Sequence, residues 1–151
     1  MNLTQLPDFV NWSVTHYVFS ERVGPFQENA QKAWQNFFAA QSKITEKISG
    51  RISLYKLEPK MIYRAGVIVE AKPAELPEGL QYEKFEGGRY ARYVLTGSYQ
   101  NLPAACGEVF KMFPSTNIQI RADAFYIENY VNDPKSTPEE KLVTEILIPI
   151  V

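Results

Sequence analysis

Glu128 has the most distinctive chemical setting in the chain, because it is a carboxylate with a tyrosine two residues away on either side, Tyr126 and Tyr130. Alternation along a strand places these three side chains on one face. If that face is buried, the charge is costly unless tyrosine hydroxyls donate hydrogen bonds to it or a cationic ligand pairs with it. If the face is open, Glu128 is merely solvated. The residues themselves leave both interpretations open.

Aromatic side chains offer a second kind of chemistry. Trp34, Phe37 and Phe110 recur at helical spacing on apolar stripes, and the simplest interpretation is core packing. Two helices related by a repeat would also leave a groove between them, and aromatic faces lining it attract cations by about 0.5–2 kcal/mol each. The candidate ligand-binding residues are therefore Glu128, Tyr130, Trp34, Phe37, Phe110, Tyr55 and Tyr93.

The single histidine and the single cysteine carry less weight. His16 precedes Tyr17 in the same strand, so its side chain points to the opposite face, and we expect it to be structural or exposed. Cys106 lies on a helical stripe and is expected to be a buried, inert thiol. One cysteine excludes an internal disulfide and a cysteine-built zinc site, and no phosphate-binding glycine loop or ligand cluster is present. We therefore predict neither a metal nor a cofactor.

The elements that must position these residues occur twice along the chain. Each half has a period-two apolar run, a glycine turn, a helical stripe and two further apolar runs. Glu128 has Ser53 as its counterpart, so one half carries the charge. Three aromatic pairs correspond at offsets of 75 or 76 residues: Tyr17 with Tyr93, Trp34 with Phe110, and Tyr55 with Tyr130.

This repetition predicts the fold. A strand–helix–strand–strand unit cannot bury its sheet face alone, so we expect the halves, at about 10–72 and 80–151, to form one domain over residues 1–151. The proline-containing stretch Ala71–Gly79 suits a connector between them. The predicted class is α+β, with one curved antiparallel sheet and two helices on its concave face.

Composition excludes several classes of function. The chain has 151 residues, 45% of them hydrophobic and 22% charged, which is typical of a globular domain. A net charge of −1 argues against direct nucleic-acid binding. No apolar run approaches the roughly 20 residues of a membrane span, and the N-terminus lacks the pattern of a signal peptide. We expect a cytoplasmic protein that does not bind membranes.

The second half carries an ordered set of motifs. Leu76–Leu80, Gly87–Ala91 and Gly97–Tyr99 are followed by Tyr126–Pro134, within which Glu-x-Tyr-x-Asn-Asp-Pro occupies residues 128 to 134. Together they resemble the GyrI-like small-molecule-binding domain. The resemblance departs from the family at the turn before Gly97, where the common histidine is absent. No helix-turn-helix segment adjoins the domain, which suggests a stand-alone form.

The resemblance implies the function. Members of this family include effector domains of multidrug-responsive MerR-type and AraC-type transcription regulators, gyrase-inhibitory proteins and some hydrolases of cyclopropane-bearing genotoxins. We expect a drug-sensing or drug-sequestering protein for lipophilic, cationic or aromatic compounds, with Glu128 as the counter-charge; the sequence favours binding over catalysis and leaves an enzyme open. One alternative is a hydrolase that uses Glu128 as its general base. Another is a gyrase-inhibitor-like interaction module, with a protein partner or a homodimer.

Overall fold

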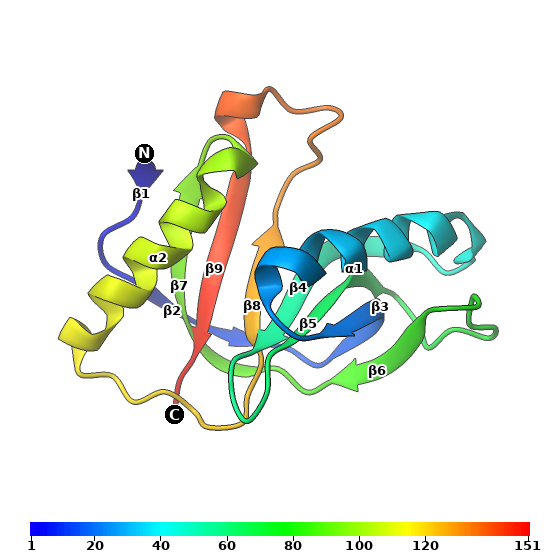
Figure 1. Cartoon of the computed structure of the whole chain (residues 1–151), viewed down its shortest axis with the longest axis horizontal. Helices are drawn as coiled ribbons and strands as arrows, with labels where there is room; N and C mark the ends of the chain where they lie inside the picture. Colours follow the sequence, from blue (N-terminus) through cyan, green and yellow to red (C-terminus); the bar gives the residue numbers. More distant parts are fainter. The chain divides into compact units, whose positions relative to one another are not determined.

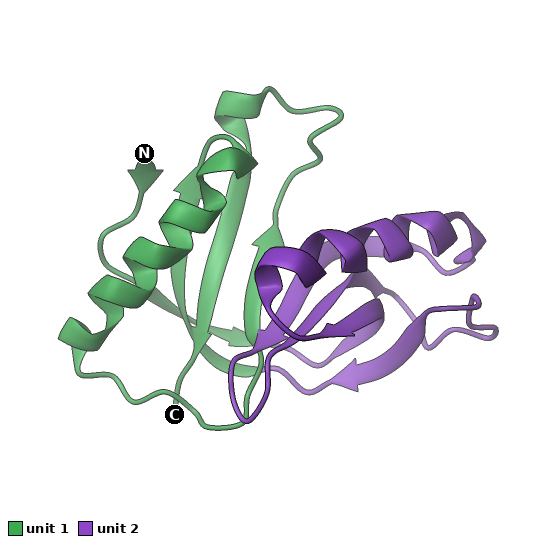
Figure 2. Cartoon of the chain, in the orientation of Figure 1, with its two compact units in different colours: residues 1–12, 88–151 green, residues 13–87 purple.

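The computed structural model describes residues 1–151 and divides into two compact units. Unit 1 comprises Met1–Trp12 and Gly88–Val151, and unit 2 comprises Ser13–Gly87 (Figure 2). Each unit contains one long helix and a set of antiparallel strands (Figure 1). None of the helices combines the length and apolar character needed to span a membrane.

Unit 2 contains one α-helix, which a short 3-10 helix follows, and four strands in the order β4-β5-β3-β6. Its elements are β3 (Thr15–Val23), α1 (Phe26–Ala40), β4 (Ile48–Lys56), β5 (Ile62–Val69) and β6 (Gln81–Phe85). The helix packs on one face of β3 and β5. Its buried positions include Asn29, Ala33 and Phe37, which recur every four residues and so lie on one stripe.

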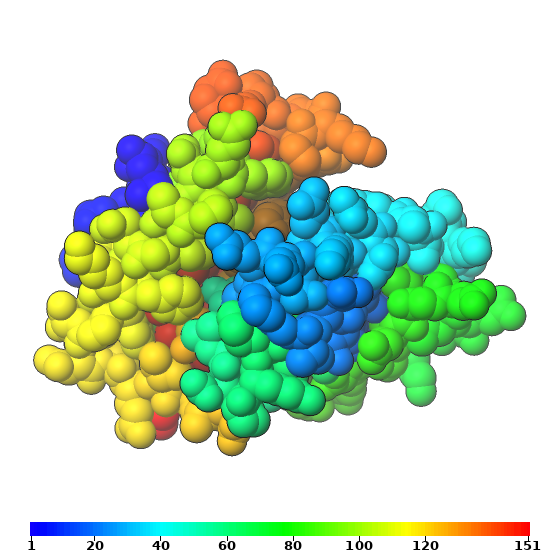
Figure 3. Space-filling view, viewed as in Figure 1, coloured from blue at the N-terminus to red at the C-terminus, as the bar shows by residue number.

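Unit 1 repeats this order and adds two short N-terminal strands. Its elements are β1 (Asn2–Leu3), β2 (Asp8–Trp12), β7 (Gly88–Thr96), α2 (Leu102–Met112), β8 (Tyr126–Tyr130) and β9 (Val143–Pro149). The central strand β9 pairs with β7 and β8, while β7 also pairs with β1 and β2. The space-filling view shows that α2 and the segment after it cover much of β7 and β9 from this side (Figure 3).

The core of unit 1 lies between α2 and the sheet. Ala105, Val109 and Phe113 recur every four residues and pack against alternate residues of β7 and β9. The β7 and β9 residues of this cluster are Ala91, Tyr93, Leu95, Ile146 and Ile148, all of them fully buried. Because Glu128 is opposite Ile146 in the β8–β9 pairing, it shares this face.

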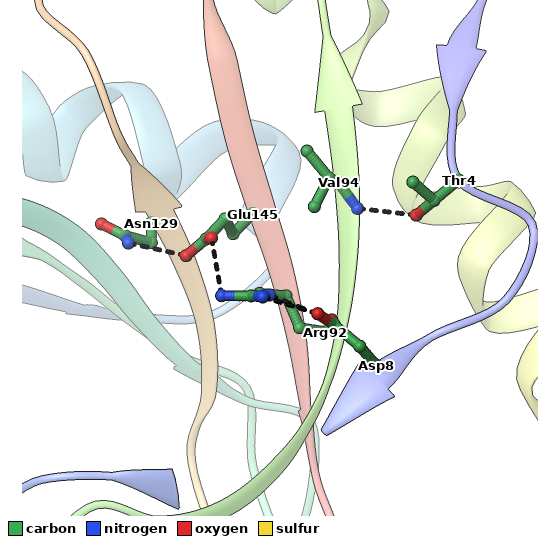
Figure 4. Close-up of polar contacts among 6 residues, drawn as sticks. All are labelled: Thr4, Asp8, Arg92, Val94, Asn129 and Glu145. Carbon is green, nitrogen blue, oxygen red and sulfur yellow. Dashed lines mark hydrogen bonds and ion pairs between the residues drawn. The ribbon is translucent and has the colours of Figure 1, made fainter. Parts of the chain in front are cut away.

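The other face of unit 1 carries a charged network. Arg92 forms two bonds with the Asp8 carboxylate, at 3.0 and 2.6 Å, and a third bond of 3.2 Å with Glu145 (Figure 4). Asn129 donates to the second oxygen of Glu145 at 2.9 Å. The Arg92 guanidinium lowers the pKa of Asp8. These contacts tie β2 to β7 and β7 to β9.

The strand pairings give the correspondence between the two halves. Tyr55 pairs with Tyr63 and Ser53 with Ala65 in unit 2, whereas Tyr130 pairs with Thr144 and Glu128 with Ile146 in unit 1. Gly24 and Gly97, which follow β3 and β7, both have a φ of 127°. Gly24 donates to the carbonyl just before β5, and Gly97 to the carbonyl just before β9. They therefore occupy equivalent positions, 73 residues apart.

The predicted pairing of Tyr17 with Tyr93 is wrong. Ser20 pairs with Ala65, as Tyr93 pairs with Ile146, so Ser20 is the counterpart of Tyr93. The offset is 73 residues in this strand but 76 in the helix, where Trp34 and Phe110 correspond. The difference of three, an odd number, moves Tyr17 to the sheet face opposite α1. There its hydroxyl donates to backbone carbonyls of β4 and β5.

The α+β class, the antiparallel sheet and the repeated strand–helix–strand–strand order are confirmed. The strands β1, β2 and β6 were not predicted. β1 has only two residues, while β2 and β6 are exposed along most of their length and lack a clear apolar period. The boundaries of a single domain over residues 1–151 stay a prediction.

Candidate functional site

Glu128 lies in the middle of β8 and faces α2. Its side chain is only 9% exposed. The Val131 N–H donates to the Val143 carbonyl, so these two residues are a hydrogen-bonded pair of the β8–β9 ladder. Hydrogen-bonded and non-hydrogen-bonded pairs alternate along an antiparallel ladder, so Glu128 and Ile146, three positions away, are a non-hydrogen-bonded pair. Such pairs bring side chains close together. The carboxylate is thus held against apolar side chains.

Two neutral donors serve this carboxylate. The Tyr130 hydroxyl donates to Oε1 at 3.0 Å, and the Cys106 thiol donates to Oε2 at 3.2 Å. No lysine, arginine or histidine forms an ion pair with Glu128. Burial raises the pKa of Glu128, and the hydrogen bonds from Cys106 and Tyr130 oppose part of that rise. The site therefore contains a buried carboxyl group that no positive side chain pairs with.

Cys106 is a donor in this arrangement and not a nucleophile. It lies on the stripe of α2 that faces β8, one residue after the buried Ala105. Burial raises the pKa of the thiol far above its ordinary value, and the adjacent Glu128 carboxylate raises it further. The thiol therefore keeps its proton at neutral pH, and that proton points to Glu128.

Aromatic rings flank Glu128 along the strand in both directions. Tyr130 meets Tyr99 edge-on, with ring centroids 5.7 Å apart. Tyr126 meets Phe110 edge-on at 5.6 Å. All four side chains are partly exposed, unlike the strand residues of the core. A carboxylate between two pairs of partly exposed rings can hold a flat or branched aromatic cation.

Two further hydroxyls belong to the same face. Tyr93 and Thr144 are both 0% exposed. The Tyr93 hydroxyl and Thr144 Oγ1 have no hydrogen-bond partner in the protein. Burial raises the pKa of Tyr93, so this hydroxyl stays protonated at neutral pH.

Trp34, Phe37 and Tyr55 belong to unit 2. Phe37 is fully buried, and Tyr55 is 5% exposed and packs edge-on against Phe26 at 5.5 Å. Trp34 Nε1 donates to the Tyr63 hydroxyl at 3.0 Å. Of the candidates named from the sequence, Glu128 and Tyr130 are in direct contact, and Phe110 lies against their neighbour Tyr126. A groove lined by both helices stays a prediction.

The counterpart of the Glu128 position in unit 2 is closed by its own side chains. Ser53 replaces the carboxylate, and its Oγ bonds the Tyr63 hydroxyl at 2.7 Å. Trp34 completes this cluster from α1. Tyr63 occupies the position of Thr144, so a large side chain stands where unit 1 has a small one. At these equivalent positions, unit 1 therefore has a carboxylate and a small side chain where unit 2 has Ser53 and a large one.

Sequence reasoning did not include Tyr99, Cys106 and Tyr126 among the candidates. Strand parity did place Tyr126 beside Glu128 on one face, but it was not carried into the list of ligand-binding candidates. Cys106 could have been found from its place on the same helical stripe as Phe110, four residues earlier. Tyr99 follows the turn after β7 and has no periodic signal.

A family model for the GyrI-like small molecule binding domain matches residues 6–151, nearly the whole chain. The chain belongs to this family. The match includes β8 and the segment Tyr126–Pro134 that carried the resemblance. No curated protein sequence matches the chain.

Solved structures share the fold of this GyrI-like domain. The C-terminal domain of EcmrR has a TM-score of 0.77 at 12% identity, covering 100% of this chain and 99% of that one. SAV2435, solved with bound tetraphenylphosphonium, has a TM-score of 0.75 at 18% identity, with coverages of 96% and 93%. An integron cassette protein from Vibrio cholerae has a TM-score of 0.73 at 18% identity and covers 100% of both chains.

Proposed function

We propose that this GyrI-like domain binds lipophilic organic cations, with Glu128 as the counter-charge and the surrounding rings as the apolar wall. The observation that carries the proposal is the buried Glu128 carboxylate, which has two neutral donors and no cationic partner. A small-molecule binding role is a property of the family, whereas the cationic class of ligand is the proposal.

The energetics of Glu128 support a cationic ligand. Burial raises the pKa of this carboxyl, so its ionised form is disfavoured in the empty protein. A thiol and a hydroxyl satisfy some of its lone pairs but leave the net charge in place. A bound cation would offset that charge in surroundings where pairing is only weakly screened.

The rings supply affinity without strict shape. The four partly exposed aromatic side chains, Tyr99, Phe110, Tyr126 and Tyr130, present faces and edges to a bound cation. Such contacts depend on charge and hydrophobicity more than on the outline of the ligand. We infer that several lipophilic cations bind, as suits a protein that senses or sequesters drugs.

A solved relative supports the choice of probe. SAV2435 was solved with tetraphenylphosphonium, a cation with four phenyl rings and no hydrogen-bonding group. The same compound tests the proposal here. Its isosteric counterpart tetraphenylborate has the same four rings and the opposite charge.

The experiment is a calorimetric titration of this protein with each ion. We expect saturable 1:1 binding of tetraphenylphosphonium and at least tenfold weaker binding of tetraphenylborate. Equal affinities would show that burial of rings alone drives binding, and would refute the role of Glu128 as the counter-charge. Loss of a cyclopropane-bearing compound from the solution at substoichiometric protein would instead indicate hydrolysis.

A further inference from the structure

A strip of polar side chains crosses the apolar face beneath α2, from β7 to β8. Tyr93 and Glu128 lie opposite the same residue, Ile146, from its two sides. Thr144 lies two residues from Ile146 on β9 and is opposite Tyr130. Thr144 is therefore a diagonal neighbour of both Tyr93 and Glu128, at a distance that side chains of this kind can bridge.

The two hydroxyls of this strip are the part that the proposed function leaves unused. Tyr93 and Thr144 are 0% exposed, and neither hydroxyl has a partner in the protein. Buried polar groups in native proteins are nearly always hydrogen-bonded, because the loss of water is otherwise uncompensated. Because these two hydroxyls lie at neighbouring positions, one polar group from outside the protein could form hydrogen bonds with both.

Unit 2 shows how the chain satisfies the same strip when no outside partner is needed. The positions of Tyr93, Thr144 and Glu128 are held there by Ser20, Tyr63 and Ser53. The Tyr63 hydroxyl bonds Ser53 Oγ at 2.7 Å and accepts a hydrogen bond from Trp34 of α1. The strip of unit 2 is thus bonded internally around Tyr63, whereas in unit 1 the hydroxyls of Tyr93 and Thr144 have no partner.

We propose that Tyr93 and Thr144 form a second, neutral polar subsite that hydrogen-bonds a hydroxyl or carbonyl group of the ligand. This inference rests on the proposed function, because the subsite lies beside Glu128 and would act on the same ligand. It narrows the ligand class to lipophilic cations that also carry a neutral hydrogen-bonding group. A hydroxyl at each end of the subsite can serve as donor or acceptor, so either kind of group fits.

The test compares phosphonium ions that differ by one hydroxyl. Tetraphenylphosphonium is titrated beside the ortho-, meta- and para-hydroxyphenyl derivatives of triphenylphosphonium, so that the hydroxyl samples three directions. We expect at least one isomer to bind about two- to tenfold more tightly than the parent ion, as one additional neutral hydrogen bond allows.

Two variants each remove one hydroxyl with little change of shape. The quantity compared is the affinity for the best hydroxylated isomer divided by the affinity for tetraphenylphosphonium. We expect this ratio to fall toward one in Tyr93→Phe and in Thr144→Val. Tyr90→Phe is the matched control on the same strand. Tyr90 faces the other way and donates to the Phe125 carbonyl at 2.7 Å. Its loss should reduce stability and leave the ratio unchanged.

The outcomes separate the two proposals. If tetraphenylphosphonium binds but no isomer binds more tightly, or if the advantage survives in both variants, the subsite is overturned and the cation site stands. If Tyr90→Phe lowers the ratio as much as Tyr93→Phe, the effect is structural and the subsite is again overturned. If none of the four ions binds, the proposed function fails and the subsite fails with it.

Discussion

Replacing Glu128 by glutamine deletes the charge and keeps the shape. The carboxylate is 9% exposed and bonds only a thiol and a hydroxyl, so the amide can keep one acceptor for these donors. The lost interaction with tetraphenylphosphonium is a charge–charge attraction, which at about 6–10 Å and an effective dielectric constant of about 20 contributes about 1.5–3 kcal/mol. The affinity for tetraphenylphosphonium should therefore fall about tenfold to a hundredfold.

The assay is calorimetric titration of wild type and Glu128→Gln with tetraphenylphosphonium and tetraphenylborate. The affinity for the anion should rise or stay the same, because the variant removes a repulsive charge and keeps the rings. Parallel losses for both ions would mean that Glu128 shapes the site and does not charge it. That result would refute the argument from its missing cationic partner.

Three further predictions follow from the same geometry. Burial raises the pKa of Glu128, so a growing fraction of this side chain is protonated and neutral as the pH falls. The affinity of wild type for tetraphenylphosphonium should therefore decrease as the pH falls through that pKa, whereas the affinity of Glu128→Gln should not change. Titrations at several pH values measure both. The raised pKa also means that ionised Glu128 destabilises the folded state. Wild type and Glu128→Gln should therefore have similar stability below the ordinary pKa of 4.5, and the variant should become the more stable protein as the pH rises through the raised pKa. Thermal unfolding of both proteins from pH 4 to 8 checks this sign. Phe37→Ala should destabilise the fold by about 3–5 kcal/mol in denaturant unfolding, because this fully buried ring is core; a stable variant that loses only ligand affinity would contradict that.

The sequence was sufficient for the class of fold because its signals are periodic. The helical spacing of Ala33 and Phe37, and of Val109 and Phe113, marks the faces that are in fact buried. The repeat added the order of elements. It failed for Tyr17, because the segment between strand and helix is three residues longer in unit 1, as the turn glycines Gly24 and Gly97 show, and an odd difference reverses strand parity.

The site could be predicted in part. Glu128 was conspicuous because strand alternation placed a carboxylate between tyrosines. Its donor Cys106 was not, because a thiol on an apolar stripe is consistent with plain core packing. The unpaired state of Thr144 could not be predicted at all, since hydrogen-bond satisfaction depends on the positions of neighbouring groups and not on the spacing of residues along the chain.

The closed Ser53–Tyr63 cluster has a consequence for how this protein could evolve. A domain made of two equivalent halves can assign structural stability to one and ligand chemistry to the other. The half with Ser53 is bonded internally, whereas the half with Glu128 contains a costly charge that only function would retain. Changes of specificity should therefore accumulate around β8 and α2, while substitutions at Ser53, Tyr63 or Trp34 would be removed because they impair folding.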